Sequence, residues 1–210
     1  MEITENLIAK TLLQINAIKL NPTNPYTWAS GWKSPIYCDN RKILSFPKAR
    51  DIVKKAFADL IKEKYGNVDV IAGVATGAIA HGALVADLLN LPFIYVRSSS
   101  KGHGLENLIE GVLEAGQKVV VIEDLISTGG SSIKAVEAIR EKNAQVLGMM
   151  AIFSYGFEIA LNNFKNAQCQ LDILSNYNTL LKIAIETGYI KSEQLETLNN
   201  WRNNPENWMK

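Results

Sequence analysis

The stretch VVVIEDLISTGGSS, residues 119–132, joins a run of apolar β-branched residues to two neighbouring acids and then to a loop of glycines and hydroxyl residues. The apolar run predicts a buried strand of a parallel sheet, because such strands are covered on both faces. Glu123 and Asp124 then fall at the carboxyl end of that strand, where ligands bind in open α/β sheets. The next helix is expected to begin near Ser131 or Ser132. This order of strand, acids, loop and helix indicates an α/β fold.

The loop after the acids has the composition of an anion site. Glycines and hydroxyl side chains at a helix N-terminus offer free N–H groups and the positive end of the helix dipole, and phosphate is the usual occupant. The acid pair would repel a phosphate, so it suits a polyol or a cation in the same ligand. A ribose 5-phosphate fits both features. Alone, the acids could cap the helix or face solvent, and the loop could be an ordinary turn; their adjacency favours one ribose-phosphate site.

The rest of the chain alternates between strand-like and helix-like segments. Apolar runs predict further strands at residues 68–74, 92–96 and 145–155, and amphipathic patterns predict helices at residues 3–18, 48–66 and 131–143, within 75–90, and twice in the tail after about residue 177. The proline- and aromatic-rich segment 20–44 predicts short strands and loops. Alternating strands and helices predict a parallel sheet covered on both faces.

The bulk composition excludes several classes of protein. The 210 residues predict one domain, and a net charge of +1 gives no support to nucleic-acid or anionic-membrane binding. No apolar run is long enough to cross a membrane, and no signal peptide is recognisable. Cys38 and Cys169 lie far apart without metal-ligand spacing, which predicts free thiols in the cytoplasm. The motifs of P-loop NTPases, zinc proteases and dinucleotide-binding folds are missing or incomplete.

Three segments resemble one known family. VVVIEDLISTGGS resembles the phosphoribosyl pyrophosphate (PRPP) motif of type I phosphoribosyltransferases. SGWKSPIYCDNRKILS, residues 30–45, resembles the substrate segment of orotate phosphoribosyltransferases, and VRSSSKGHG, residues 96–104, resembles their flexible loop. The resemblance implies the type I phosphoribosyltransferase fold: a mostly parallel central sheet flanked by helices, with a small N-terminal hood. It also implies a single domain over residues 1–210, with the hood and substrate segment at about 1–45 and the core at about 46–210.

The resemblance further implies the activity. Members transfer the phosphoribosyl group from PRPP to orotate, giving orotidine 5′-monophosphate and pyrophosphate in pyrimidine (UMP) biosynthesis. They require Mg²⁺, which is expected to be held mainly by PRPP with no direct protein ligand. They act as homodimers in which the flexible loop closes over the active site of the neighbouring subunit, so a homodimer with shared sites is expected here.

The expected roles follow the motifs. Lys101, His103 and Asp124 are the candidate catalytic residues: Asp124 favours the positive charge that builds on the ribose, and Lys101 and His103 stabilise departing pyrophosphate. The same residues and their neighbours form the candidate PRPP site: Arg97, Lys101, His103, Glu123, Asp124, Leu125, Ile126, Ser127, Thr128, Gly129, Gly130, Ser131 and, by resemblance to the pyrophosphate loop, Thr76. On spacing alone, Arg97, Lys101 and His103 would be interpreted as part of a solvated basic loop without a ligand, and it is the resemblance that favours a functional loop.

Orotate is flat and anionic, so it needs aromatic walls and fixed donors. Ser127, Lys33 and Tyr37 are the candidate orotate ligands, whereas the tryptophans of the segment are expected to be core or interface residues. Ala29 and Tyr155 depart from the family, because some members carry a lysine and an arginine near these positions. Three other functions stay open: a purine phosphoribosyltransferase, a PRPP-sensing regulator that binds nucleic acid, and a phosphosugar-binding domain without catalysis.

Overall fold

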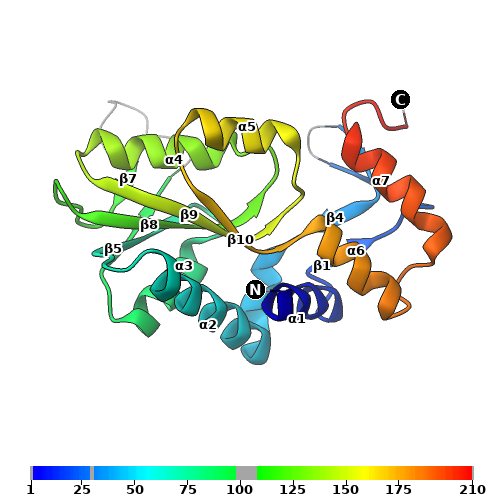
Figure 1. The fold of residues 1–210 in the computed structure, drawn as a ribbon, viewed down its shortest axis with the longest axis horizontal. Coiled ribbons are helices and arrows are strands. Elements are labelled where there is room, and N and C mark those ends of the chain that lie inside the picture. Colours follow the sequence, from blue (N-terminus) through cyan, green and yellow to red (C-terminus); the bar gives the residue numbers. More distant parts are fainter. Residues whose placement is uncertain (1, 29–30, 98–107, 210) are drawn as a thin grey trace.

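A six-stranded sheet forms the centre of the computed structural model, which describes residues 2–28, 31–97 and 108–209 (Figure 1). Its order is β10-β9-β8-β5-β6-β7, and every neighbouring pair is parallel except β6 and β7. The strands are β5 (Val70–Val74), β6 (Phe93–Val96), β7 (Ile109–Glu110), β8 (Lys118–Ile126), β9 (Gln145–Ser154) and β10 (Leu171–Asn176). The mostly parallel sheet expected from the apolar runs is therefore confirmed.

Helices cover both faces of this sheet. On one face lie α4 (Gly130–Glu141) and α5 (Glu158–Asn166), and on the other lie α2 (Pro47–Lys64) and α3 (Ile79–Leu89) (Figure 1). Each face has its own apolar core. Val136 and Phe164 pack in the first core, and Phe57 and Val85 pack in the second. Residues 119–122 of β8 are all apolar and buried because they contribute to both cores.

The N-terminal and C-terminal segments of the chain lie side by side next to the sheet (Figure 1). The N-terminal elements are α1 (Glu2–Gln14), the antiparallel pair β1 (Ile18–Leu20) and β4 (Ile36–Cys38), the antiparallel pair β2 (Tyr26–Thr27) and β3 (Lys33–Ser34), and the 3-10 helix η1 (Asn40–Ser45). The C-terminal elements are α6 (Tyr177–Glu186), the 3-10 helix η2 (Ser192–Gln194) and α7 (Leu195–Asn203). The rings of Trp28 and Trp201 meet edge to face, with centroids 5.6 Å apart, and join the two ends.

Three expected boundaries were wrong, each for a local reason. Helix α1 ends at Gln14 instead of residue 18, because Asn16 has a φ of 55°, a left-handed conformation that stops a helix. Helix α4 begins at Gly130, one residue earlier than expected, after Gly129 with a φ of 80°. Strand β8 continues to Ile126, so the acid pair lies inside the strand and not at its end. The reason is that β8 stays paired with β9 as far as Ile126, although its pairing with β5 stops at Ile122.

Five elements had no counterpart in the sequence-based prediction: β7, α5, β10 and the 3-10 helices η1 and η2. Strand β7 has two residues, too few for a periodic pattern. In the described ranges, none of the helices combines the length and the apolar character needed to span a bilayer.

Candidate active site

Glu123 and Asp124 lie beyond the last residue of β8 that pairs with β5, so the sheet edge is open beside them. Glu123 is 5% exposed and points toward α4. Its carboxylate accepts hydrogen bonds from the Ser132 hydroxyl at 2.9 Å and from the Asp124 N–H at 3.0 Å. Burial, followed by the negative charge of Asp124, raises the pKa of Glu123 to about 8. Glu123 is therefore tied to the start of α4.

Asp124 has a different environment from its neighbour. Its side chain is partly exposed and lies against Gly77, in the loop after β5. A Cβ built on Gly77 would lie only 2.6 Å from Asp124 Oδ1, so a larger residue there would displace the carboxylate. The backbone oxygen of Asp124 accepts a hydrogen bond from the side-chain amide of Asn40 at 2.6 Å. Glu123 thus contacts the start of α4, whereas Asp124 contacts the loop after β5.

The loop of residues 127–129 leads into an uncapped helix. None of its own side chains caps α4, so the first N–H groups of the helix are available to an anion. Helix α5 supports this loop from behind: the Asn163 side-chain amide donates to the Thr128 carbonyl at 2.9 Å, and Phe164 would be 3.0 Å from a Cβ on Gly129. Asn163 and Phe164 were missed by the sequence reasoning, because helix α5 itself was not recognised.

Two further site residues lie at the same edge of the sheet. Thr76 is exposed in the loop that connects β5 to α3, and Arg97 directly follows β6. The Arg97 guanidinium is 3.6 Å from the Glu110 carboxylate, which holds it beside β7. Because the carboxyl ends of β5, β6 and β8 meet at this edge, Thr76, Arg97 and the acid pair are gathered on one side of the molecule.

A cavity of about 310 Å³ adjoins the end of β8. It is lined by Thr27, Trp28, Tyr37, Cys38, Leu125, Ser127 and Tyr155. We call it the acceptor pocket. It brings together the predicted ligands Tyr37 and Ser127, which are far apart in the sequence. Burial raises the pKa of both the Cys38 thiol and the Tyr155 hydroxyl, so these two walls stay neutral and do not repel an anion.

An aromatic cluster forms the floor of the acceptor pocket. The Tyr155 ring lies 5.4 Å from Trp28 and 5.6 Å from Trp201, measured between centroids. The Arg202 guanidinium donates to the carbonyls of Tyr155 at 3.2 Å and Gly156 at 3.3 Å. Trp28 therefore packs in a cluster, as expected, but it also lines the pocket. Trp201 and Arg202 are supports that no motif in the sequence indicated.

Lys33 is exposed at the margin of this pocket and does not line it. Its ammonium group donates to the Thr27 hydroxyl at 2.9 Å, and Thr27 belongs to the lining. Lys101, His103 and Ala29, which were singled out in the sequence, lie outside the described residues.

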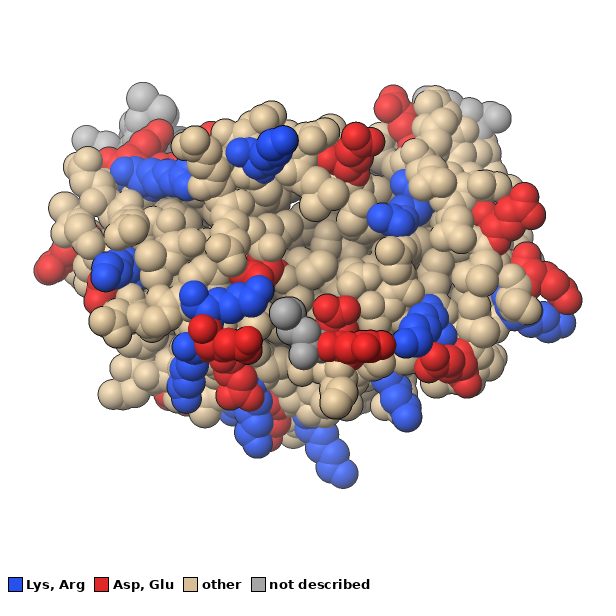
Figure 2. All heavy atoms as spheres, in the orientation of Figure 1, with Lys and Arg blue, Asp and Glu red and all other residues tan. Residues whose placement is uncertain are grey.

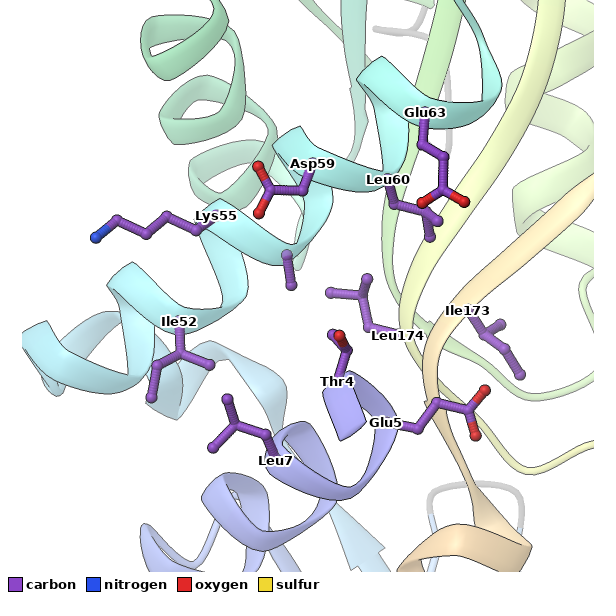
Figure 3. Close-up of a pocket in the computed structure, with 11 residues that line it drawn as sticks. Thr4, Glu5, Leu7, Ile52, Lys55, Asp59, Leu60, Glu63, Ile173 and Leu174 are labelled. Carbon is purple, nitrogen blue, oxygen red and sulfur yellow. The ribbon is translucent and has the colours of Figure 1, made fainter. Parts of the chain in front are cut away.

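A second hollow, of about 320 Å³, lies between α1, α2 and β10 and contains none of the predicted site residues (Figure 3). Leu7, Ile52 and Leu60 face into it, and three acids, Glu5, Asp59 and Glu63, accompany one lysine, Lys55. The excess of acids makes it unfavourable for a phosphorylated ligand. In the part of the chain that the structure describes, no group of three or more His, Cys, Asp or Glu could hold a metal ion.

Comparisons with known proteins show which family the chain is similar to. Residues 39–184 match the family model of the phosphoribosyl transferase domain. The chain is 62% identical over 208 residues to an orotate phosphoribosyltransferase of Bacteroides thetaiotaomicron, covering 99% of this chain and 98% of the relative.

Solved structures show the same fold. An orotate phosphoribosyltransferase of Aeropyrum pernix superimposes with a TM-score of 0.76 at 25% identity, covering 88% of this chain and 99% of that one. The Mycobacterium tuberculosis orotate phosphoribosyltransferase in complex with PRPP superimposes with a TM-score of 0.65 at 20% identity, covering 84% and 98% of the two chains. The chain belongs to the orotate phosphoribosyltransferases of the type I phosphoribosyltransferase family.

Proposed function

We propose that this chain transfers the phosphoribosyl group of PRPP to orotate, with PRPP bound along β8 and the start of α4 and orotate bound in the acceptor pocket. The products are orotidine 5′-monophosphate and pyrophosphate, as in pyrimidine biosynthesis. One observation carries the arrangement: Leu125 and Ser127 directly follow the acid pair and also line the pocket. An acceptor in this pocket would therefore lie beside the ribose that Asp124 holds.

PRPP has three parts, and each meets a matching group in this proposal. The N–H groups and hydroxyls of residues 127–131 hold the 5′-phosphate. Asp124, which is partly exposed, accepts hydrogen bonds from the ribose hydroxyls, and Glu123, which is buried and bonded to Ser132, holds the start of the phosphate-binding helix α4 in place. Thr76, Arg97, Lys101 and His103 contact the pyrophosphate; this rests on the family resemblance and, for Thr76 and Arg97, is supported by their position at the same sheet edge.

The reaction breaks the bond between the anomeric carbon and a pyrophosphate oxygen and forms a bond from that carbon to a ring nitrogen of orotate, whose N–H proton is released to pyrophosphate or solvent. Positive charge builds on the ribose and negative charge on the leaving group. Asp124 stabilises the former, while Lys101 and Arg97 stabilise the latter. His103 donates a hydrogen bond or a proton to the departing pyrophosphate. Positioning of both substrates supplies most of the remaining rate enhancement.

Mg²⁺ fits this site as a companion of PRPP. Carboxylate and phosphate oxygens are the ligands that Mg²⁺ prefers, and it is often bound through few protein groups and the phosphates of its substrate. Mg²⁺ would be held mainly by PRPP, and Asp124 is a described, partly exposed carboxylate beside the loop after β5. When bound, Mg²⁺ would neutralise charge on the leaving pyrophosphate.

The orotate carboxylate needs a positive partner that the acceptor pocket itself lacks. All seven described residues of its lining have uncharged side chains. The Lys33 ammonium group donates a hydrogen bond to Thr27, a residue of the lining, so it is a described cation at the margin of the pocket that could pair with the carboxylate. Tyr37 would form an aromatic wall, and Ser127 would donate a hydrogen bond to the base. Lys33 thereby offsets the positive charge that is lost at Ala29 and Tyr155.

The proposal includes a homodimer, in which the segment with Lys101 and His103 completes the active site of the neighbouring subunit and excludes water. It also includes a cytoplasmic location, supported by two free cysteines, and a single functional unit composed of a hood at about residues 1–45 and a core at about 46–210.

The test is the loss of orotate absorbance in the presence of PRPP and Mg²⁺. Turnover that requires both supports the proposal. Turnover with adenine, guanine or hypoxanthine but not with orotate would assign the chain to a purine transferase. A regulator that binds nucleic acid would instead show PRPP-dependent retardation of DNA or RNA; the intermixed basic and acidic side chains on the face in Figure 2 offer such a ligand no broad basic patch.

A further inference from the structure

Asn40 lies where the acceptor side of the site meets the acid pair. It is the first residue of η1 and follows Cys38, a wall of the acceptor pocket, by two positions. Its side chain is 1% exposed. Its amide nitrogen donates to the backbone oxygen of Asp124 at 2.6 Å, across 84 positions of sequence. This hydrogen bond directly joins the acceptor segment to the strand that carries the acids.

The Asp124 carbonyl lies at an irregular point of the sheet. Pairing of β8 with β5 ends at Ile122, and the register of β8 with β9 passes from Glu123 to Leu125 without Asp124. At this point Asn40 supplies a side-chain donor to the carbonyl. The orientation of the Asp124 peptide is therefore tied to the acceptor segment.

The other polar atoms of Asn40 indicate a function beyond packing. Because a carbonyl can only accept, the nitrogen of the Asn40 amide must face Asp124. Its Oδ1 is then buried and has no hydrogen-bond partner among the described residues. A site shaped only for stability would favour a satisfied or apolar group here. The backbone oxygen of Asn40 lies 3.3 Å from Nε2 of the buried His81, which belongs to α3. Asn40 is therefore also in contact with α3.

We propose that Asn40 is a positioning residue, which fixes the Asp124 peptide and so aligns the ribose of PRPP with the acceptor pocket. The inference rests on the proposed transfer reaction. Tyr37 and Cys38 of the pocket lining precede Asn40, and Leu125 and Ser127 of the same lining follow Asp124. The hydrogen bond between Asn40 and Asp124 therefore links two separate stretches of the lining as well as orienting the Asp124 peptide.

The matched test compares two substitutions with a control. Asn40→Leu has nearly the same shape, removes the donor and also removes the unpaired oxygen. Asn40→Asp also keeps the shape but cannot donate when ionised. Arg50→Ala is the control, because the Arg50 guanidinium donates to the Leu44 carbonyl at 3.3 Å and anchors the same 3-10 helix without contacting Asp124. The measurements are kcat, the KM for PRPP, the KM for orotate and the thermal midpoint.

We expect kcat of Asn40→Leu to fall about tenfold or more, because a small misalignment of reacting groups is costly, while the KM for PRPP changes less than about threefold. Its thermal midpoint should stay within about 4 °C of the wild type, since one hydrogen bond is lost and one unpaired atom removed. Arg50→Ala should keep wild-type kcat, even if its midpoint falls.

The opposite results would overturn the inference. One is that kcat of both Asn40 variants stays within about twofold of the wild-type value. The other is that Arg50→Ala loses as much kcat as the Asn40 variants at an equal loss of stability. If Asn40→Leu does not fold, Asn40→Asp decides by the same criteria. Absence of orotate turnover in the wild type would instead contradict the proposed function, so the two failures are distinguishable.

Discussion

The PRPP segment and the acceptor pocket are adjacent in space but are built in opposite ways. The PRPP segment is nearly continuous: the acids, the loop and the first turn of α4 lie within residues 123–132. The acceptor pocket takes its lining from three separate stretches, around Trp28, Tyr37 and Ser127, and from Tyr155. A continuous site keeps its geometry through local backbone structure, whereas an assembled site depends on long-range packing.

This difference predicts different consequences of mutation. Substitutions in the PRPP segment should act through the bound phosphate and ribose, so they should change PRPP binding or the rate of the chemical step. Substitutions around the acceptor pocket should act through the relative placement of distant elements. They should therefore change orotate binding, with smaller kinetic effects than substitutions in the PRPP segment.

The largest effect is expected from Lys101→Ala, which removes the cation assigned to the leaving pyrophosphate. We expect kcat to fall about 100-fold or more, because a charge that forms in the transition state loses its partner, while PRPP binding weakens less. Steady-state kinetics with PRPP titrated at saturating orotate would measure both. Lys134→Ala, an exposed lysine on α4, is the control. A wild-type rate for Lys101→Ala would contradict the role of Lys101 in the chemical step.

The next effect concerns the stability of the free protein, through Glu123. Its pKa is raised from 4.5 to about 8 in the folded state, so the folded state binds more protons than the unfolded state between these values. The free energy of unfolding should therefore fall as pH rises through this window, by on the order of 2 kcal/mol between pH 6 and 8. Glu123→Gln should remove this decline.

The measurement is urea unfolding of both proteins at several pH values without ligand. His81, whose pKa is lowered mainly by burial, contributes in the opposite direction below pH 7, and it is present in both proteins. Parallel pH profiles for the wild type and Glu123→Gln would contradict the buried, protonated Glu123.

The sequence predicts the continuous PRPP segment better than the assembled acceptor pocket. In the PRPP segment, residue types and order were enough to expect a strand, two acids, an anion loop and a helix. The boundary of β8 was wrong because it depends on pairing with β9, which a single strand does not encode. The opposite directions of Glu123 and Asp124 follow from strand alternation, but their partners, Ser132 and Gly77, were not foreseen.

A third prediction tests the local geometry of the PRPP loop. Gly129 has a φ of 80° and lies against Phe164, so Gly129→Ala should distort the loop and raise the KM for PRPP about tenfold. Gly116→Ala is a matched control, because Gly116 has a φ of 85° but open space around it and lies outside the site. Both variants should lose stability. An equal KM for PRPP in the two variants would show that the conformation of Gly129 is not needed for binding.

For the acceptor pocket, sequence reasoning identified Tyr37 and Ser127 but could not place them together. Lys33 was expected in the pocket and is found at its margin, bonded to Thr27. The supports Trp201 and Arg202 come from the last helix, where the pattern shows only an amphipathic segment. Contacts between residues more than 40 positions apart leave no periodic signal in one sequence, so this part of the site required the structure.

The smallest effect is expected from a substitution of Arg202 in the last helix. Arg202 donates to the carbonyls of Tyr155 and Gly156, which carry one wall of the acceptor pocket. Arg202→Lys keeps the charge but loses the planar two-pronged donor, so the KM for orotate should rise about threefold while the KM for PRPP stays unchanged.

Arg140→Lys is the matched control, because the Arg140 guanidinium also donates to two neighbouring carbonyls, those of Ala167 and Gln168, but outside the acceptor pocket. It should change neither KM. If Arg202→Lys raised the KM values for PRPP and orotate equally, Arg202 would stabilise both regions. The distinction between a locally built PRPP segment and an assembled acceptor pocket would then be wrong. If it raised only the KM for orotate, the last helix would be part of the acceptor site even though it does not line the pocket.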